Sequence, residues 1–131
     1  ADVVAMGVES VLGVHHHVAI VTDLESWAVT VDPVAVQQIV SNLVRNAADA
    51  ARSRVTIRQR AGNIRIEDDG PGVPTDLVPR LYEPFVTTKP PGEGTGLGLF
   101  VTSTLVKAIG ASISLDTTSA GTVVTVDVPK P

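Results

Sequence analysis

The strictest pattern in this sequence is a pair of short segments in which apolar and polar residues alternate. Residues 55–59 and 63–67 alternate with period two on either side of Ala61-Gly62, which predicts a β-hairpin whose strands each have one buried face. Apolar residues make up 44% of the 131 residues, which is enough for one hydrophobic core. We therefore expect a single domain covering residues 1–131.

The clearest helix start in the sequence is Asp32-Pro33. The Asp32 carboxylate can accept hydrogen bonds from the free amide groups of a first helical turn, and Pro33 fits a position where its missing N–H costs nothing. We expect this helix to run to about Ala51. The apolar residues that should form a stripe along it are Val36, Ile39, Leu43, Ala47 and Ala50.

Weaker patterns predict the remaining elements. A second helix should extend from about Leu97 to Ile109, where Gly110 provides a stop signal. A short helix is expected over residues 2–12, and β-branched residues predict strands at residues 17–23, 26–31, 112–117 and 122–128. The Pro- and Gly-rich residues 69–96 should be mostly loop, and a loop of this length is usually functional.

Charge and composition exclude several classes of function. The net charge of -4 argues against a nucleic-acid binder, which normally has a clustered basic surface. Without cysteine the chain has no disulfide and no thiolate metal site, which is compatible with the cytoplasm, where we expect it to act. No apolar run approaches the roughly 20 residues of a membrane helix, so we expect no direct membrane contact. Because the chain starts without methionine and enters at once on apolar Val3-Val4-Ala5-Met6, we interpret it as a fragment of a longer protein.

Three groups of polar residues and glycines are candidates for chemistry, and the first is on the Asp32-capped helix. Asn42, Asn46 and Asp49 are spaced by four and three residues, so they share one face beside the apolar stripe. Amide and carboxylate oxygens are hard ligands suited to Mg²⁺. The alternative interpretation is an ordinary solvated helix face.

The second group follows the hairpin. Period two puts Asp68 on the same face as Ile64 and Ile66, so its carboxylate should point toward the interior. A buried charge needs a partner, and the amino group of a ligand would be a suitable donor. Gly70 and Gly72 would let the backbone approach a flat ligand closely. The alternative here is a simple turn after a strand.

The third group is the glycine-rich run of residues 92–99, directly before the second helix. Glycines that lead into a helix N-terminus expose backbone N–H groups to a phosphate, and the helix dipole adds to that preference. No Gly-Lys-Ser/Thr follows, and the run is not a Gly-x-Gly-x-x-Gly after a strand, so two common nucleotide folds are disfavoured. A flexible loop is the alternative.

In this order and spacing, the three groups resemble the N, G1 and G2 boxes of the GHKL superfamily, which includes histidine kinases, gyrase-type topoisomerases and the large heat-shock chaperones. The resemblance covers roughly Asp32 to Pro129, and residues 82–89 look like the F box of sensor kinases. It implies an α/β, two-layer sandwich (the Bergerat fold), with helices on one face of a mixed, mostly antiparallel sheet. It also implies the ATP-binding catalytic domain of a sensor histidine kinase in two-component signalling.

The resemblance also implies roles for single residues. Asn46 would hold Mg²⁺, Asn42 would support the phosphate side, and Asp68 would accept a hydrogen bond from the adenine amino group. Gly72 would leave room for the base, and Gly70 would belong to the same pocket. Lys89 would be a catalytic cation near the terminal phosphates. The other residues that it assigns to the ATP pocket are Asp49, Phe85, Thr87, Thr88, Gly94, Thr95, Gly96, Leu97, Gly98 and Leu99.

Two departures within the superfamily bear on the activity. Hydrolytic members resemble this helix but carry a glutamate at the position of Asn42, and that glutamate acts as a base toward water. An amide cannot take that proton, so Asn42 favours the kinase branch. At Asp49 many sensor kinases have a basic residue, whereas asparagine-alanine-x-aspartate is familiar in a nitrogen-sensor-like branch. A gyrase- or chaperone-like ATPase and a degenerate nucleotide-binding module stay open as alternatives.

A kinase of this class transfers phosphate to a histidine that is usually followed by an acidic residue on a helical dimerisation domain. His15, His16 and His17 instead run into a β-branched segment, so none of them fits the acceptor. We therefore expect the acceptor domain to be absent from this chain and the receiver domain of a response regulator to act downstream. The isolated domain should be monomeric and its parent protein a homodimer.

Overall fold

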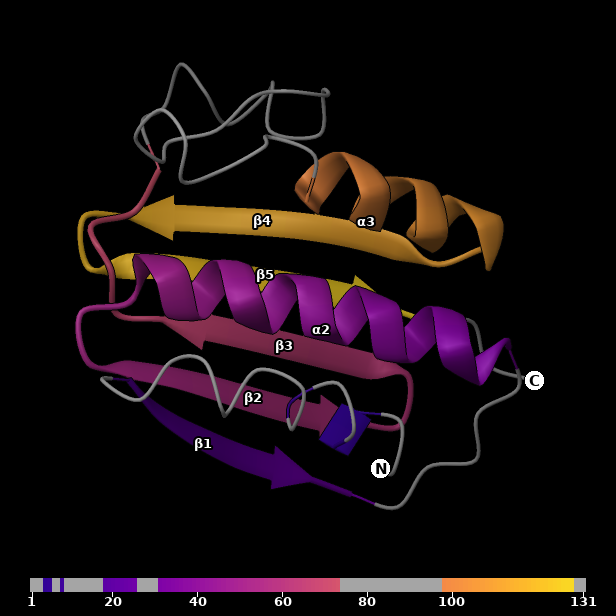
Figure 1. Ribbon diagram of the computed structural model, residues 1–131, viewed down its shortest axis with the longest axis horizontal. Coiled ribbons are helices and arrows are strands. Elements are labelled where there is room, and N and C mark those ends of the chain that lie inside the picture. The colour runs from indigo at the N-terminus through magenta and orange to yellow at the C-terminus, as the bar shows by residue number, and fades with distance from the viewer. Residues whose placement is uncertain (1–3, 6–7, 9–17, 26–30, 74–97, 129–131) are drawn as a thin grey trace.

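The structure, a computed structural model, describes residues 4–5, 8, 18–25, 31–73 and 98–128. Figure 1 shows its main elements. In chain order they are β1 (Ala19–Leu24), α2 (Pro33–Ala50), β2 (Arg54–Arg60), β3 (Asn63–Asp68), α3 (Gly98–Ala108), β4 (Ser112–Thr118) and β5 (Gly121–Asp127). Val4, Ala5 and Val8 are also helical.

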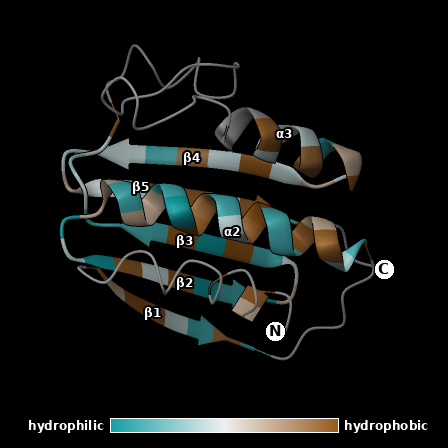
Figure 2. Ribbon diagram, in the orientation of Figure 1, coloured by the Kyte–Doolittle hydropathy of each residue, from teal (hydrophilic) through white to brown (hydrophobic). Residues whose placement is uncertain are grey.

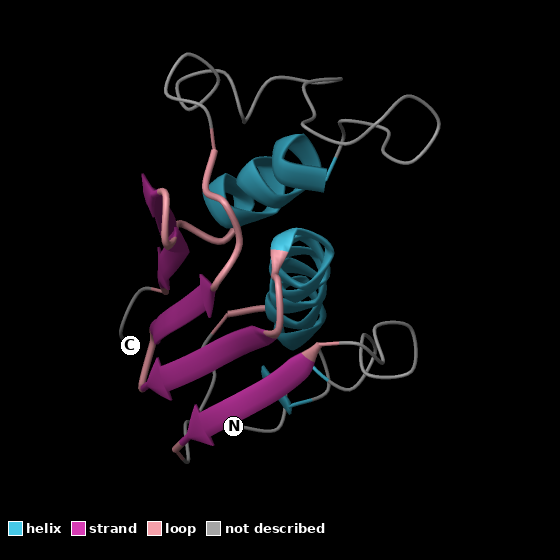
Figure 3. Cartoon of the chain, turned by 90° about the vertical axis from the view of Figure 1, so that its left-hand side faces the viewer, coloured by secondary structure: helices cyan, strands magenta, loops and turns pink. Residues whose placement is uncertain are grey.

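The strands form one mixed sheet in the order β1-β2-β3-β5-β4. β1 pairs with β2 in parallel, and the other three pairs are antiparallel. Figure 3 shows α2 and α3 on the same side of this sheet. The prediction of a two-layer sandwich with helices on one face of a mostly antiparallel sheet is therefore confirmed.

Helix α2 begins as its sequence predicts. The Asp32 carboxylate accepts a hydrogen bond from the backbone N–H of Val34 at 3.0 Å, and the helix ends at Ala50 with Ala51 as its C-cap. Hydrophobic and hydrophilic residues alternate along it at the helical period (Figure 2). One predicted member of the apolar stripe is wrong: Ala50 is exposed, because Ala47, Ala48 and Ala51 are the residues that face the core at this end of the helix.

The core lies between the sheet and the helices. Four members of the predicted stripe on α2 are buried, and the same helix also buries Val40, Val44 and Ala48. They pack on alternate residues of the central strands, among them Val55, Ile57, Ile64 and Ile66. Val4 and Val8 join this cluster, which fits the helix expected over residues 2–12.

The other predicted elements agree with the structure to within two residues at most ends. Strands predicted at residues 17–23, 55–59, 63–67, 112–117 and 122–128 correspond to β1, β2, β3, β4 and β5, and the helix predicted at 97–109 is α3. Gly110 follows α3 with a positive φ of 73°, a conformation that suits glycine after a helix. The strand predicted at residues 26–31 lies outside the described residues except for Val31, and His15, His16 and His17 lie wholly outside them. In the described part of the chain, no helix is long and apolar enough to cross a membrane.

Candidate functional site

The three residues on the polar face of α2 become more exposed along the helix, from the core to the solvent within two turns. Asn42 is buried at 9% exposure, Asn46 is half-buried and Asp49 is exposed. The Asn42 side-chain oxygen accepts a hydrogen bond from the Gln38 amide group at 3.1 Å. The amide N–H₂ of Asn42 has two N–H bonds that it can donate to a further partner. The predicted common face is thus present, and Asn46 stands at its boundary with the core.

Asp68 is the last residue of β3 and shares the core face with Ile64 and Ile66, as its spacing predicts. Its Oδ1 accepts a hydrogen bond from the Gly70 backbone N–H at 2.8 Å. Burial raises the pKa of the Asp68 carboxyl above its ordinary value. Backbone N–H groups of Gly70 and Thr122 oppose that rise, and the charge of Asp69 adds to it. A half-buried carboxylate of this kind is a strong acceptor for a ligand that brings a donor.

Gly70 brings the turn after β3 against the end of α2. A Cβ atom at this position would collide with the backbone carbonyl oxygen of Ala50, and it would lie 2.9 Å from Oδ1 of Asp68. Any larger residue would therefore push the turn away from the helix. Because Gly70 has no side chain, the Asp68 carboxylate lies beside the last turn of α2. Asn46 lies on the same helix, one turn before Ala50.

Gly72 has a structural role as well. Its φ of 80° suits glycine, and a Cβ atom there would collide with the backbone oxygen of Thr118 and approach Oγ1 of Thr117 to 2.8 Å. Next to it, the Val73 backbone N–H donates to Thr117 Oγ1 at 2.8 Å, and the hydroxyl groups of Thr117 and Thr122 are 3.0 Å apart. The turn after Asp68 is therefore fixed to β4 and β5.

These two threonines were missed by reasoning from sequence. Strand register puts Thr122 opposite Asp68 on β5, and Thr117 opposite Thr122 on β4. All three residues lie on the helix-covered face, so the hydroxyl groups extend the polar site from Asp68 across two strands. The strand register would have placed both threonines beside Asp68, but the pairing of β3 with β5 cannot be recognised from the local sequence pattern.

Asp69 has a different environment from its neighbour. Its Oδ1 accepts hydrogen bonds from the backbone N–H groups of Arg52 at 2.8 Å, Ser53 at 3.0 Å and Arg54 at 3.1 Å. The Ser53 hydroxyl donates to Oδ2 at 2.6 Å. These bonds, led by that of the Ser53 hydroxyl, hold the pKa of Asp69 well below its ordinary value. Asp69 therefore fastens the α2–β2 connection to the end of β3 and has a structural role.

Replacing Asp69 with Ala should lower the midpoint of thermal unfolding by several degrees at neutral pH, because four hydrogen bonds to one carboxylate are lost. Since its pKa is lower in the folded chain, Asp69 stabilises the fold above about pH 4, and this contribution is lost as the pH falls further. The parent should therefore lose stability below pH 4 more steeply than Asp69→Ala. Thermal unfolding followed by circular dichroism from pH 3 to 7 measures both effects.

The matched control for this experiment is Asp116→Ala, which removes an exposed carboxylate from the opposite face of the sheet on β4. It should shift the unfolding midpoint little at any of these pH values. Equal shifts for Asp69→Ala and Asp116→Ala would show that the hydrogen bonds to Asp69 contribute nothing measurable.

The remaining predicted site residues are at the edge of the described ranges or beyond them. Gly98 and Leu99 form the first turn of α3, so the glycine-rich run does lead into a helix N-terminus. α3 packs against α2, which brings the two helices of the candidate site together. The others lie outside the described residues: Phe85, Thr87, Thr88, Lys89, Gly94, Thr95, Gly96 and Leu97.

Comparison with known families gives a match over most of the chain. Residues 31–131 match the family described as histidine kinase-, DNA gyrase B-, and HSP90-like ATPase. The match begins one residue before the Asp32 cap and includes every element from α2 to β5. It also includes Asn42, Asn46 and Asp68.

Individual relatives are sensor kinases. The chain is 36% identical over 106 residues to the two-component sensor PprA of Pseudomonas aeruginosa, an overlap of 71% of this chain and 12% of PprA. The mycobacterial sensor histidine kinase MprB has a similar structure, with a TM-score of 0.85, 25% identity and coverage of 98% of this chain and 92% of the MprB chain. Full-length ShkA in complex with AMPPNP gives a TM-score of 0.81, 27% identity and coverage of 98% and 29%. The chain thus spans about an eighth of the length of its curated relative PprA.

Proposed function

We propose that this chain, which belongs to the histidine kinase-, DNA gyrase B-, and HSP90-like ATPase family, presents Mg-ATP for phosphoryl transfer to a histidine on a separate domain. The chain is an ATP-binding catalytic domain of the sensor histidine kinase type. We further propose that residues 1–131 act as one domain. One observation carries the proposal. The Gly70 turn holds the half-buried Asp68 carboxylate against the end of the helix that bears Asn42 and Asn46.

Asp68 is suited to the base end of the nucleotide. Its carboxylate accepts from the backbone N–H groups of Gly70 and Thr122 and still has acceptor sites left, which suit the exocyclic amino group of adenine. Desolvation makes each remaining hydrogen bond to this carboxylate stronger than it would be in water. The fixed turn around Gly72 orients the carboxylate before the ligand arrives, which lowers the entropic cost of binding.

The chemistry of α2 is suited to Mg²⁺ and phosphate. No group of three acidic, histidine or cysteine side chains that could enclose a metal occurs within the described ranges, so a cation here would depend on few protein ligands. The half-buried Asn46 amide offers one hard oxygen, which fits an ion that usually keeps waters and shares phosphate oxygens. When bound, Mg²⁺ neutralises charge on the phosphates. Asn42, whose oxygen accepts from Gln38, also has two N–H bonds to donate, and these suit a phosphate oxygen.

The amide side chain of Asn42 favours a kinase over an ATPase. A general base must accept a proton from water, and a neutral amide has no basic site for it. Asn42 is in addition buried and already hydrogen-bonded through its oxygen. The described residues of this helix face therefore support nucleotide binding without activation of water, and the nucleophile is supplied from elsewhere.

We propose as partners a histidine-bearing helical dimerisation domain of the same parent protein and, downstream, the receiver domain of a response regulator. The similarity to two-component sensors supports both. The isolated domain is proposed to be monomeric, its parent a homodimer, and the site of action the cytoplasm. Lys89, Thr87 and Thr88 are proposed to cover the terminal phosphates as part of a lid.

Titration calorimetry with ATP, with and without excess chelator, tests this function. The parent should bind Mg-ATP, and saturating ATP should raise its unfolding free energy by roughly 1 to 3 kcal/mol. Asn46→Ala should lose most of the Mg²⁺-dependent part of the affinity and little of the metal-free part, because its proposed partner is the ion. We expect a loss of about tenfold in the presence of Mg²⁺.

Val34→Ala is a matched control, since Val34 is an exposed residue of the same helix near its start, at 69% exposure. It should bind ATP like the parent in both conditions. Absence of any heat or thermal stabilisation for the parent at millimolar ATP would remove the proposed function. Equal losses for Asn46→Ala with and without chelator would mean that Asn46 forms the pocket wall.

A further inference from the structure

The charges around the candidate site do not match a nucleotide triphosphate. The chain has a net charge of -4, Asp49 lies in the last turns of α2, and the Gly70 turn holds Asp68 near the end of that helix. A triphosphate brings several more negative charges into the same region. Mg²⁺ offsets only two of them, so the phosphate end of the pocket needs positively charged side chains.

Most basic side chains in the described part of the chain are directed elsewhere. Arg54, at the start of β2, lines a pocket together with Asp68, at the proposed base end of the site. The other exposed arginines of the hairpin lie on the sheet face opposite the helices, because exposed and buried residues alternate there; they are Arg58, Arg60 and Arg65. Arg60 and Arg65 are also engaged in salt bridges of 2.7 Å, to Asp23 and Glu67 respectively. These arginines cannot serve a site on the helix-covered face.

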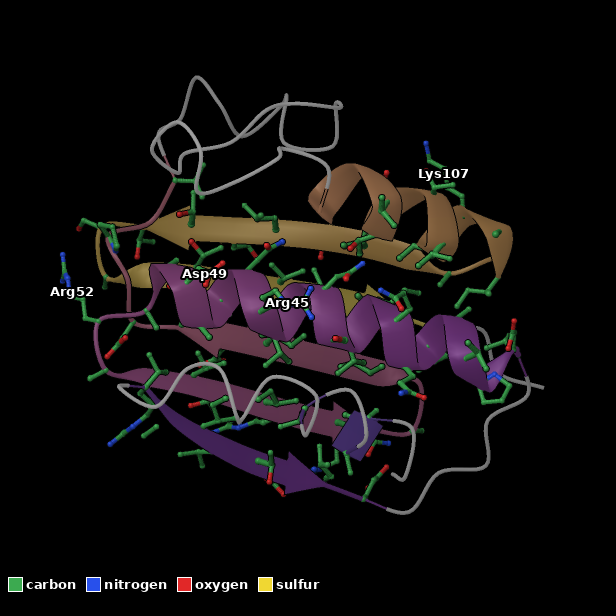
Figure 4. The ribbon with its side chains drawn as sticks, viewed as in Figure 1. Arg45, Asp49, Arg52 and Lys107 are labelled. Atoms are coloured by element: carbon green, nitrogen blue, oxygen red, sulfur yellow. The ribbon has the colours of Figure 1, made fainter. Side chains whose placement is uncertain are left out.

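Figure 4 shows the basic side chains that remain on the helix layer. Arg52 lies beyond the end of α2 and extends away from the molecule, and Lys107 extends from α3 away from α2. Arg45 is different, because it lies within α2 on the same side as Asp49. Among the residues that the structure describes, Arg45 is thus the cation placed on the helix that carries the proposed phosphate and Mg²⁺ ligands.

The position of Arg45 along α2 matches the phosphate end. It directly precedes Asn46 and follows Asn42 by three residues, a spacing at which side chains are neighbours on a helix. It is exposed, and it forms no salt bridge within the described ranges. Its long side chain is thus available to extend over the face that Asn42 and Asn46 share.

We propose that Arg45 is a nucleotide-binding residue of this domain, whose guanidinium group contacts the terminal phosphates of ATP. The inference rests on the proposed function, and it adds to the proposed ATP site a positively charged side chain from helix α2. Arginine is suited to this role because its planar group binds phosphate oxygens in a bidentate manner. A cation at position 45 also compensates for the acidic Asp49, one turn further along the helix.

The test compares the binding of Mg-ATP, Mg-ADP and AMP to the parent, Arg45→Gln and Arg45→Lys by titration calorimetry. Arg45→Gln should bind ATP about tenfold more weakly, the usual loss for one hydrogen bond between charged groups, and AMP within about twofold of the parent. Arg45→Lys keeps the charge but not the bidentate geometry, so it should recover part of the ATP affinity. Arg58→Gln removes an exposed arginine from the opposite sheet face and should leave all three affinities unchanged.

The three nucleotides separate phosphate binding from structural damage. Arg45→Gln that binds ATP as tightly as the parent, or that loses ATP and AMP equally, would overturn the role of Arg45. An equal loss of ATP affinity in Arg58→Gln would also overturn it, because the effect would then reflect net charge alone. If the parent bound none of the three nucleotides, the proposed function itself would fail, and this result is visible before any variant is made.

Discussion

Asp68→Asn is expected to weaken ATP binding by about 10- to 150-fold, the range for loss of a hydrogen bond to a charged group. The substitution is conservative for the fold, since the asparagine oxygen can still accept from the Gly70 N–H that now donates to Oδ1 at 2.8 Å. At the second oxygen position, however, it replaces an acceptor with an N–H₂ donor. A donor facing the amino group of adenine cannot form that hydrogen bond.

The effect on stability should be small and separates the two interpretations of Asp68. Burial raises the pKa of this carboxyl, so its charge is held in the folded chain at a cost that Asn removes. That gain should offset the weaker interaction with the Thr122 backbone. We therefore expect ligand-free Asp68→Asn to unfold within about 1 kcal/mol of the parent while its ATP affinity falls.

Glu67→Gln is the matched control for Asp68→Asn. It neutralises the neighbouring carboxylate of β3, which lies on the opposite face of the sheet in a salt bridge with Arg65. Its ATP affinity should equal that of the parent by calorimetry. If Asp68→Asn also bound ATP like the parent, Asp68 would be a turn residue and the adenine contact would be excluded.

Local signals were sufficient to predict most of the fold. The Asp32-Pro33 start, the alternation in residues 55–59 and 63–67, and the Gly110 stop each act within a few residues, and each predicted an element that the structure has. The inward direction of Asp68 also followed from local period two. The arrangement of these elements in two layers came instead from resemblance to a family, because sheet order depends on contacts between distant segments.

What sequence reasoning missed depends on such distant contacts. The hydroxyl pair of Thr117 and Thr122 joins the site only because β5 lies between β3 and β4. The structural role of Asp69 requires the α2–β2 connection to fold back on the end of β3. Ala50 was wrongly placed in the core because helical periodicity fits Ala50 and Ala51, three and four residues after Ala47, equally well, and Ala51 is the one that is buried.

Gly70 shows how the interpretation from sequence and the structure differ at a single residue. From sequence, Gly70 indicates close approach to a ligand, whereas the structure gives it a contact with the Ala50 carbonyl oxygen. This contact joins the turn that holds Asp68 to the helix that holds Asn46. The distance between the base end and the phosphate end of the proposed pocket is thus set by backbone packing rather than by either side chain.

Asn42 bears on whether water or another group would receive the phosphoryl group. Asn42 has a neutral amide side chain, so it cannot act as a base toward water. Transfer of a phosphoryl group depends mainly on positioning and on stabilising negative charge. Under the proposed function, Asn46 and Asp68 position ATP, and another domain supplies the nucleophile in line with the terminal phosphate.

The isolated domain is therefore expected neither to hydrolyse ATP at an appreciable rate nor to label itself, yet to label the histidine-bearing helical domain of its parent protein when the two are mixed. Radiolabelled ATP is added to each domain alone and to the mixture, and acid-labile label and free phosphate are measured. Asn46→Ala should reduce transfer at least in proportion to its loss of Mg-ATP binding, and Asp116→Ala, on the opposite sheet face, should leave transfer unchanged. Rapid release of phosphate without the acceptor domain would identify an ATPase of the gyrase or chaperone type. Tight ATP binding without transfer to the acceptor would identify a nucleotide-binding module that has lost its chemistry.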